Sequence, residues 1–168
     1  MGRVVIPKEI RRTMRIREGD PLEIFTNREG EVIFKKYSAM ESISQKVQVF
    51  ADALSRATAK PAAVCDRDTV LAVAGVPKKD YQERSVSESL AERMHKRENY
   101  VRRAGDTTRA PLTESGTASL SVVIPIISES DCIGAIVLLM PENGAVATEQ
   151  DIRLASLLAA VLASEMAE

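Results

Sequence analysis

The hydrophobic pattern near the start of the chain is typical of short strands. Residues 22–26 and 31–37 are rich in strand-forming side chains, and polar turn residues 27–30 separate them. This arrangement predicts a β-hairpin. The β-branched run at residues 2–6 predicts an earlier strand, and Pro7 favours a short helix over residues 7–14. The expected order is therefore strand, helix, strand, strand.

Two longer segments repeat hydrophobic residues at helical spacing. The first covers residues 40–57, with Met40, Ile43, Val47, Phe50, Leu54 and Ala57. The second covers residues 148–166 and opens with Thr148 and Asp151 at capping-box spacing. It carries two apolar stripes. The first consists of Ile152, Ala155, Ala159, Leu162 and Met166, and the second of Leu154, Leu158 and Val161. Two stripes exceed what one sheet face covers, so we expect these helices to form a bundle across subunits.

Between these helices, four apolar runs predict an antiparallel sheet. The strands are expected at residues 62–65, 69–74, 120–127 and 132–140. A surface helix is expected over residues 85–97, with Ser85 as its N-cap and Glu88 completing a capping box, and a long functional or disordered loop over residues 101–116. The fold class is α+β with two domains: residues 1–37, a linking helix at 38–60, and residues 61–168.

Charge distinguishes the start of the chain from the rest. The 168 residues contain 23 basic and 24 acidic side chains, but residues 1–17 hold one acidic residue, Glu9, and six basic ones: Arg3, Lys8, Arg11, Arg12, Arg15 and Arg17. Such an excess of positive charge indicates a surface for a polyanion.

The basic residues of the predicted short helix share one face. Lys8, Arg11, Arg12 and Arg15 fall at positions i, i+3, i+4 and i+7. Like charges at these spacings weaken a helix, so helix stability does not explain them. Phosphate groups of DNA would neutralise them and release counterions. On charge alone, a basic face that contacts only solvent is an equally good interpretation.

A family resemblance favours the DNA interpretation. The segments GRVVIPKEIRR (residues 2–12) and IREGDPLEI (residues 16–24) resemble the swapped-hairpin domain of the AbrB transition-state regulators. The resemblance implies a β-barrel made by interleaved hairpins of two chains, a homodimer that binds double-stranded DNA through Arg3, Arg11 and Arg12. We add Lys8 and Arg15 on geometry alone. The family domain usually begins earlier, with one more strand, so we expect the barrel to be incomplete here.

Residues 38–168 resemble a GAF domain, which follows such a DNA-binding domain in AbrB-type regulators of sporulation. The resemblance implies a transcriptional regulator of sporulation genes. From the apolar stripes of helices 40–57 and 148–166, we expect these helices to join two DNA-binding dimers into a tetramer. The resemblance also implies a pocket for a small-molecule effector of unidentified chemistry, beside residues 85–97 and 101–116. Arg102, Arg103 and Arg109 could contact an anionic effector there, although a solvated loop is the more common role of such residues.

Other classes of protein remain as alternatives. Some GAF domains reduce free methionine sulfoxide with cysteines, but this chain has only Cys65 and Cys132, which we interpret as reduced thiols without a zinc-ligand spacing. Related barrels also occur in antitoxins. His95 is the single histidine and is interpreted as half-exposed and structural. We therefore expect no catalysis, no metal and no cofactor, and a cytoplasmic protein without membrane association.

Overall fold

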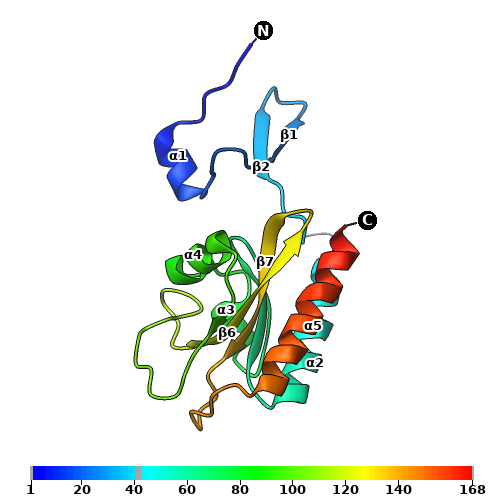
Figure 1. Cartoon of the computed structure of the whole chain (residues 1–168). Helices are drawn as coiled ribbons and strands as arrows, with labels where there is room; N and C mark the ends of the chain where they lie inside the picture. Colours follow the sequence, from blue (N-terminus) through cyan, green and yellow to red (C-terminus); the bar gives the residue numbers. More distant parts are fainter. Residues whose placement is uncertain (1, 41–42, 168) are drawn as a thin grey trace. The chain divides into compact units, whose positions relative to one another are not determined.

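A computed structural model describes residues 2–40 and 43–167 of the chain. The chain divides into two compact units, Met1–Ser38 and Ala39–Glu168, which are described separately. Together they give an α+β protein with two sheets, one of two strands and one of five (Figure 1).

The first unit contains one short helix and one hairpin. Helix α1 spans Lys8–Thr13, and strands β1 (Leu22–Thr26) and β2 (Val32–Lys36) pair antiparallel. The Asn27 side chain closes the hairpin loop by accepting hydrogen bonds from the backbone N–H groups of Glu29 and Glu31, at 3.1 and 2.9 Å. The predicted helix and hairpin are confirmed, with slightly shorter bounds.

The expected strand at residues 2–6 is wrong for the chain as the structure describes it. Residues 2–7 have no regular secondary structure. Val4 and Val5 are 69% and 85% exposed. A strand needs a neighbouring strand to satisfy its backbone hydrogen bonds, and the sheet of this unit consists of β1 and β2.

The second unit is built on a five-stranded antiparallel sheet in the order β4-β3-β7-β6-β5. The strands are β3 (Ala62–Asp66), β4 (Val70–Ala74), β5 (Tyr100–Val101), β6 (Leu120–Ser128) and β7 (Asp131–Leu139). Helices α2 (Ser44–Thr58) and α5 (Glu149–Met166) pack on one face of this sheet, and α3 (Lys78–Tyr81) and α4 (Glu88–Lys96) pack on the other (Figure 1). The predicted sheet and flanking helices are confirmed.

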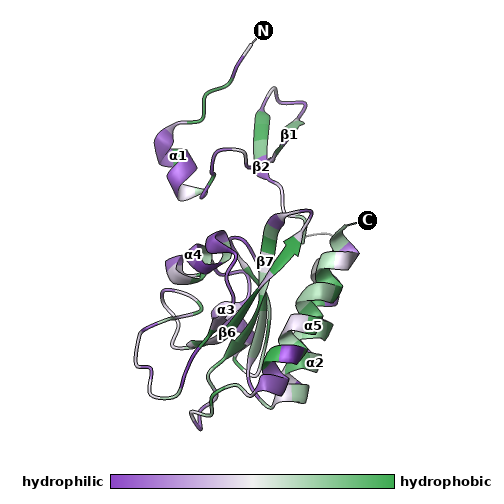
Figure 2. Ribbon diagram, viewed as in Figure 1, coloured by the Kyte–Doolittle hydropathy of each residue, from purple (hydrophilic) through white to green (hydrophobic). Residues whose placement is uncertain are grey.

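Each face of this sheet contributes to its own hydrophobic core. Val122, Ile124, Ile136 and Leu138 pack with α2 and α5, whereas Val123, Val137 and Leu139 pack toward α4. The central strands β6 and β7 are therefore apolar along most of their length, as the hydropathy colouring shows (Figure 2). Burying one large aliphatic side chain contributes about 1.5–3 kcal/mol, so each of these residues adds substantially to the stability of the unit.

Two of the predicted helices differ in detail from the structure. In α2 the buried positions include Ala51 and Thr58, while Phe50 is half-buried and Ala57 is exposed, so the face that packs on the sheet is rotated from the predicted one. In α4 the N-cap is Ser87, whose hydroxyl accepts a hydrogen bond from Leu90 N at 3.0 Å. The predicted capping box at Ser85 is wrong because that residue pairs with Thr69 in an isolated β-bridge.

Helix α5 begins as predicted, and its cap is joined to a buried ion pair. Thr148 and Asp151 form the capping box. The Asp151 Oδ2 atom also accepts a hydrogen bond from Lys60 Nζ at 2.8 Å, and the two side chains are only 10% and 9% exposed. Burial raises the pKa of Asp151, but the hydrogen bonds from Lys60 and Thr148 outweigh it and the net pKa is lowered.

Replacing Asp151 tests this ion pair. Asp151→Ala leaves Lys60 buried without its partner and should lower the free energy of unfolding by about 3–5 kcal/mol at pH 7, measured by urea denaturation. Glu149→Ala, an exposed carboxylate in the same helical turn, is the matched control and should cost far less. Equal losses in the two variants would contradict the assignment.

The same pair predicts a pH dependence. Because the pKa of Asp151 is lowered in the folded protein, its contribution to stability is present above the ordinary carboxyl pKa of about 4. That contribution is lost as the pH falls through the lowered pKa. The stability difference between the natural chain and Asp151→Ala should therefore shrink when unfolding is measured at successively lower pH.

Candidate nucleic-acid interface

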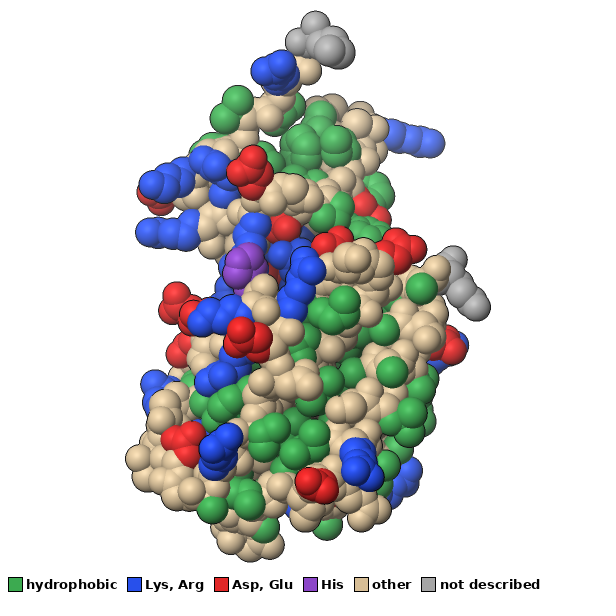
Figure 3. Space-filling view, in the orientation of Figure 1, with side chains coloured by type: hydrophobic (Ala, Val, Ile, Leu, Met, Phe, Trp, Pro, Cys, Tyr) green, Lys and Arg blue, Asp and Glu red, His purple; other side chains and the backbone are tan. Residues whose placement is uncertain are grey.

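Helix α1 presents three basic side chains to solvent. Lys8, Arg11 and Arg12 are all exposed, and the helix has no buried residue. In the described part of the chain none of the three takes part in an ion pair. Arg3 is also exposed, in the extended segment before the helix. Figure 3 shows Lys and Arg side chains projecting from this unit. Unpaired, exposed cations on one short element are suited to contacting phosphate groups.

The ends of α1 explain how such a short, strongly basic helix forms. Pro7 precedes it with φ −57°, close to the helical value, and its carbonyl accepts a hydrogen bond from Arg11 N at 3.0 Å. Glu9 lies in the first turn, and Arg11 and Arg12 lie in the last, where each charge interacts favourably with the helix dipole.

Arg15 does not belong to the basic face that the helical spacing predicted. The helix ends at Thr13, and Arg15 has a positive φ of 54°. Ile16 N donates to Arg11 O at 2.8 Å and Arg15 N donates to Arg12 O at 3.2 Å, which is a Schellman motif. The Arg15 carbonyl accepts a hydrogen bond from Lys36 Nζ at 3.0 Å. Arg15 therefore links the helix end to the hairpin, and glycine, the usual signal for this turn, is absent there.

Beside this basic face, the first unit exposes most of its large apolar side chains. Ile24 is 63% exposed, Val32 58% and Phe25 49%, and Ile10 and Met14 of the helix region are also exposed. Paired residues such as Ile24 and Phe34 lie on the opposite sheet face from Phe25 and Ile33. Both faces of the hairpin thus lack a complete covering by the described residues of the first unit.

In the second unit, the loop expected to be functional or disordered is held by a buried arginine. Arg102 is 8% exposed. Its guanidinium donates hydrogen bonds to the carbonyl oxygens of Leu120, Asp106 and Thr108 at 3.0, 2.9 and 2.7 Å. Because these donors are used inside the fold, Arg102 is a structural residue rather than a contact for an anionic effector. Arg103 and Arg109 are exposed, and Arg109 donates to Glu114 O at 3.0 Å.

The two cysteines have the properties of unreactive thiols. Cys65 is fully buried, and desolvation, with the nearby Asp66 carboxylate, raises its pKa strongly. Cys132 is half-buried and its pKa is also raised, chiefly by desolvation. Since the thiolate is the nucleophile, a raised pKa disfavours redox catalysis by either residue. His95 is exposed rather than half-exposed.

Two properties of residues 2–40 and 43–167 bear on metals and membranes. No group of three or more His, Cys, Asp or Glu side chains there is arranged to hold a metal ion. None of the helices in that part of the chain is both long enough and apolar enough to cross a bilayer.

Two pairings in the second unit had no predicted counterpart. One is Lys60 with Asp151, which are 91 residues apart. The other is Arg93, whose guanidinium carbon lies 3.7 Å from the centroid of the Tyr100 ring. Neither pair has a local spacing that periodicity could have detected, although the helical position of Arg93 beside the buried Leu90 and Met94 indicates a residue at the edge of the core.

Comparison with protein families covers both units. Residues 42–167 match the family described as stage V sporulation protein T C-terminal, transcription factor. Residues 1–41 match the family described as antidote-toxin recognition MazE, bacterial antitoxin. The chain is also 44% identical to stage V sporulation protein T of Bacillus subtilis (strain 168) over 138 aligned residues. The alignment covers 82% of this chain and 78% of that protein.

Comparison with solved structures confirms the fold of the second unit. The GAF domain of an Acinetobacter phosphoenolpyruvate-protein phosphotransferase is similar with a TM-score of 0.59 at 13% identity, over 79% of this chain and 84% of that chain. A type II free methionine-R-sulfoxide reductase from Thermoplasma acidophilum has a TM-score of 0.58 at 14% identity, over 77% and 95% of the two chains. At these identities the likeness shows a GAF-like fold and nothing about activity.

The family matches agree with the predicted class of protein. The expected resemblance to a sporulation regulator is confirmed, and the matched family is described as a transcription factor, which supports a regulator rather than an enzyme. The chain belongs to the stage V sporulation protein T family of transcription factors.

Proposed function

We propose that this chain binds double-stranded DNA through Arg3, Lys8, Arg11 and Arg12 of its first unit, as a homodimer of that unit. The observation that carries the proposal is the combination of exposed, unpaired cations with an exposed apolar hairpin. The cations supply a surface for phosphate groups, and the apolar hairpin supplies a reason for two chains to associate. The family relationship supports a role in transcription.

The size of the first unit supports dimerisation. Units shorter than about 40 residues rarely bury enough apolar surface to fold alone. The unit at Met1–Ser38 lies at that limit and leaves Ile24, Phe25 and Val32 about half exposed or more. Interleaving with the hairpin of a second chain would cover both faces of this sheet, and it would place two copies of α1 on one DNA-binding surface.

Helices α2 and α5 offer a second surface for self-association. On α5, Leu157 is 62% exposed and Val161 is 41% exposed, and on α2 Val49 is 63% exposed. The two helices contact each other on one face of the sheet. Pairing this surface with its copy would join two DNA-binding dimers into a tetramer. The half-buried Leu154 and Leu158 would contribute to the same bundle.

The basic face can be tested by the salt dependence of DNA binding. Affinity for a fluorescent duplex of mixed sequence is measured by anisotropy between about 50 and 200 mM salt. Log affinity falls linearly with log salt concentration, and the steepness of this line should decrease by about one unit for each phosphate contact that is lost. We expect this decrease in each of four variants: Arg3→Ala, Lys8→Ala, Arg11→Ala and Arg12→Ala. Arg84→Ala, an exposed arginine of the second unit, should leave the slope unchanged. Unchanged slopes in all four variants would refute the interface.

The two association surfaces can be separated by sedimentation velocity. Phe25→Glu should break the hairpin interface and leave dimers joined by the helices, whereas Leu157→Glu should break the helical interface and leave dimers joined by the hairpins. The double variant should be monomeric. Thr107→Glu, which places the same charge on an exposed loop, should remain a tetramer. A tetrameric Leu157→Glu protein would show that this helical surface is not an interface.

A further inference from the structure

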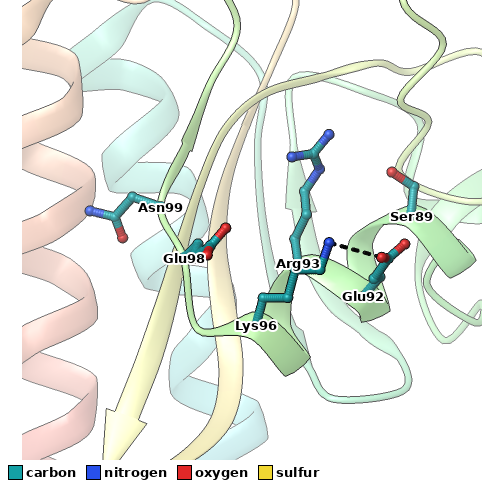
Figure 4. A pocket seen from close by; sticks show the side chains of 6 residues that line it. All are labelled: Ser89, Glu92, Arg93, Lys96, Glu98 and Asn99. Carbon is teal, nitrogen blue, oxygen red and sulfur yellow. Dashed lines mark ion pairs between the residues drawn. The ribbon is translucent and has the colours of Figure 1, made fainter.

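A small cavity lies on the flank of α4, beside the edge strand β5. Its volume is about 150 Å³, and it is lined by Ser89, Glu92, Arg93, Lys96, Glu98 and Asn99. The first four side chains come from α4 and the last two from the segment that leads into β5 (Figure 4). None of the lining residues belongs to the hydrophobic core between α4 and the sheet. The cavity is therefore lined by polar and charged side chains on the flank of α4 and not by the hydrophobic core that α4 forms with the sheet.

Arg93 lies over an aromatic ring, and one of its guanidinium donors is buried without a partner. Its guanidinium lies over the Tyr100 ring, with 3.7 Å between the guanidinium carbon and the ring centroid. The Arg93 Nε atom is buried and has no hydrogen-bond partner. Leaving a buried donor unsatisfied costs about 1–3 kcal/mol. A carboxylate is a suitable acceptor, because a guanidinium presents its N–H groups as a planar fork that matches two oxygens.

The other charged residues at the cavity are an ion pair, Lys96 with Glu92, and a single carboxylate, Glu98. Lys96 Nζ lies 3.0 Å from Glu92 Oε1, and this hydrogen bond lowers the pKa of Glu92. The Arg93 charge also lowers the pKa of Glu92, although less than Lys96 does. Glu98 makes no hydrogen bond or ion pair with any described residue, and it does not pair with Arg93 across the cavity. The cavity is thus lined by Arg93, whose charge also acts on the Glu92 and Asp106 carboxylates, and by the exposed Glu98, and neither residue forms an ion pair with a described side chain.

We propose that this cavity binds a small zwitterion of the size of a free amino acid. The ligand carboxylate would accept hydrogen bonds from Arg93, and its ammonium group would interact with Glu98. The cavity volume indicates a small ligand, because pockets for drug-sized ligands measure about 300–1,000 Å³ and this cavity is smaller. A nucleotide or a tetrapyrrole is too large for it.

Complementarity of both charges distinguishes this ligand from a simple ion. An anion alone would be attracted by Arg93 but repelled by Glu98. A cation alone would be attracted by Glu98 but repelled by Arg93. The Ser89 hydroxyl and the Asn99 amide are neutral groups at the same cavity and can donate to or accept from either end of a zwitterion. The proposal concerns binding only and does not depend on whether the first unit binds DNA.

Binding is tested on the full chain, without DNA, by following backbone amide signals in NMR titrations. Glycine, L-serine and 4-aminobutyrate serve as zwitterions with different charge separations, and acetate and methylammonium serve as single-charge probes. At least one zwitterion should saturate with shifts centred on Ser89, Arg93 and Glu98. Acetate and methylammonium should bind at least tenfold more weakly.

Variants identify the groups responsible. Arg93→Lys keeps the positive charge over Tyr100 but lacks the planar fork, and Glu98→Gln keeps the shape of an exposed side chain without its charge. Each should weaken zwitterion binding at least tenfold. Arg84→Lys and Glu142→Gln, on exposed positions elsewhere in the second unit, are the matched controls and should bind as the natural chain does. Absence of binding by all three zwitterions, equal binding of acetate, or unchanged affinity in both cavity variants would each overturn the proposal.

Discussion

The burial of the central strand pair on both faces governs the architecture of the second unit. Strands β6 and β7 carry large aliphatic side chains alternately toward both sides of the sheet, so neither side can face water. Helices α2 and α5 cover one side, and α4 with the loop of residues 102–119 covers the other. The long loop can complete this covering because the Arg102 guanidinium donates hydrogen bonds to the carbonyl oxygens of Asp106, Thr108 and Leu120. These bonds fix the path of the loop.

The first unit shows the opposite balance. It has too few residues to enclose a core, and its helix has no buried side chain. Its hairpin is nevertheless well specified, with a regular antiparallel register and a loop closed by Asn27. A unit with fixed local structure and incomplete burial is suited to association with a second copy.

The exposure of the basic residues in the first unit was easier to predict from the sequence than the helix ends and caps of the two units. Arg3, Lys8, Arg11 and Arg12 are exposed as the charge pattern and the resemblance imply. Arg15 is not on their face, because the chain leaves the helix through a left-handed residue that is an arginine instead of the usual glycine. Similarly, Ser85 looks like a helix cap in sequence, but its pairing with Thr69 keeps that segment extended and moves the cap to Ser87.

By itself, the sequence determined the features whose hydrogen bonds and periodicity are local: the hairpin at residues 22–36, the capping box of Thr148 and Asp151, and the two apolar strands at the centre of the sheet. Tertiary structure alone decided which face of α2 is buried, that Lys60 meets Asp151, and that Arg93 stacks on Tyr100. The physical reason is that such contacts join residues from different elements. Their energies depend on how those elements pack, and no spacing along the chain records that packing.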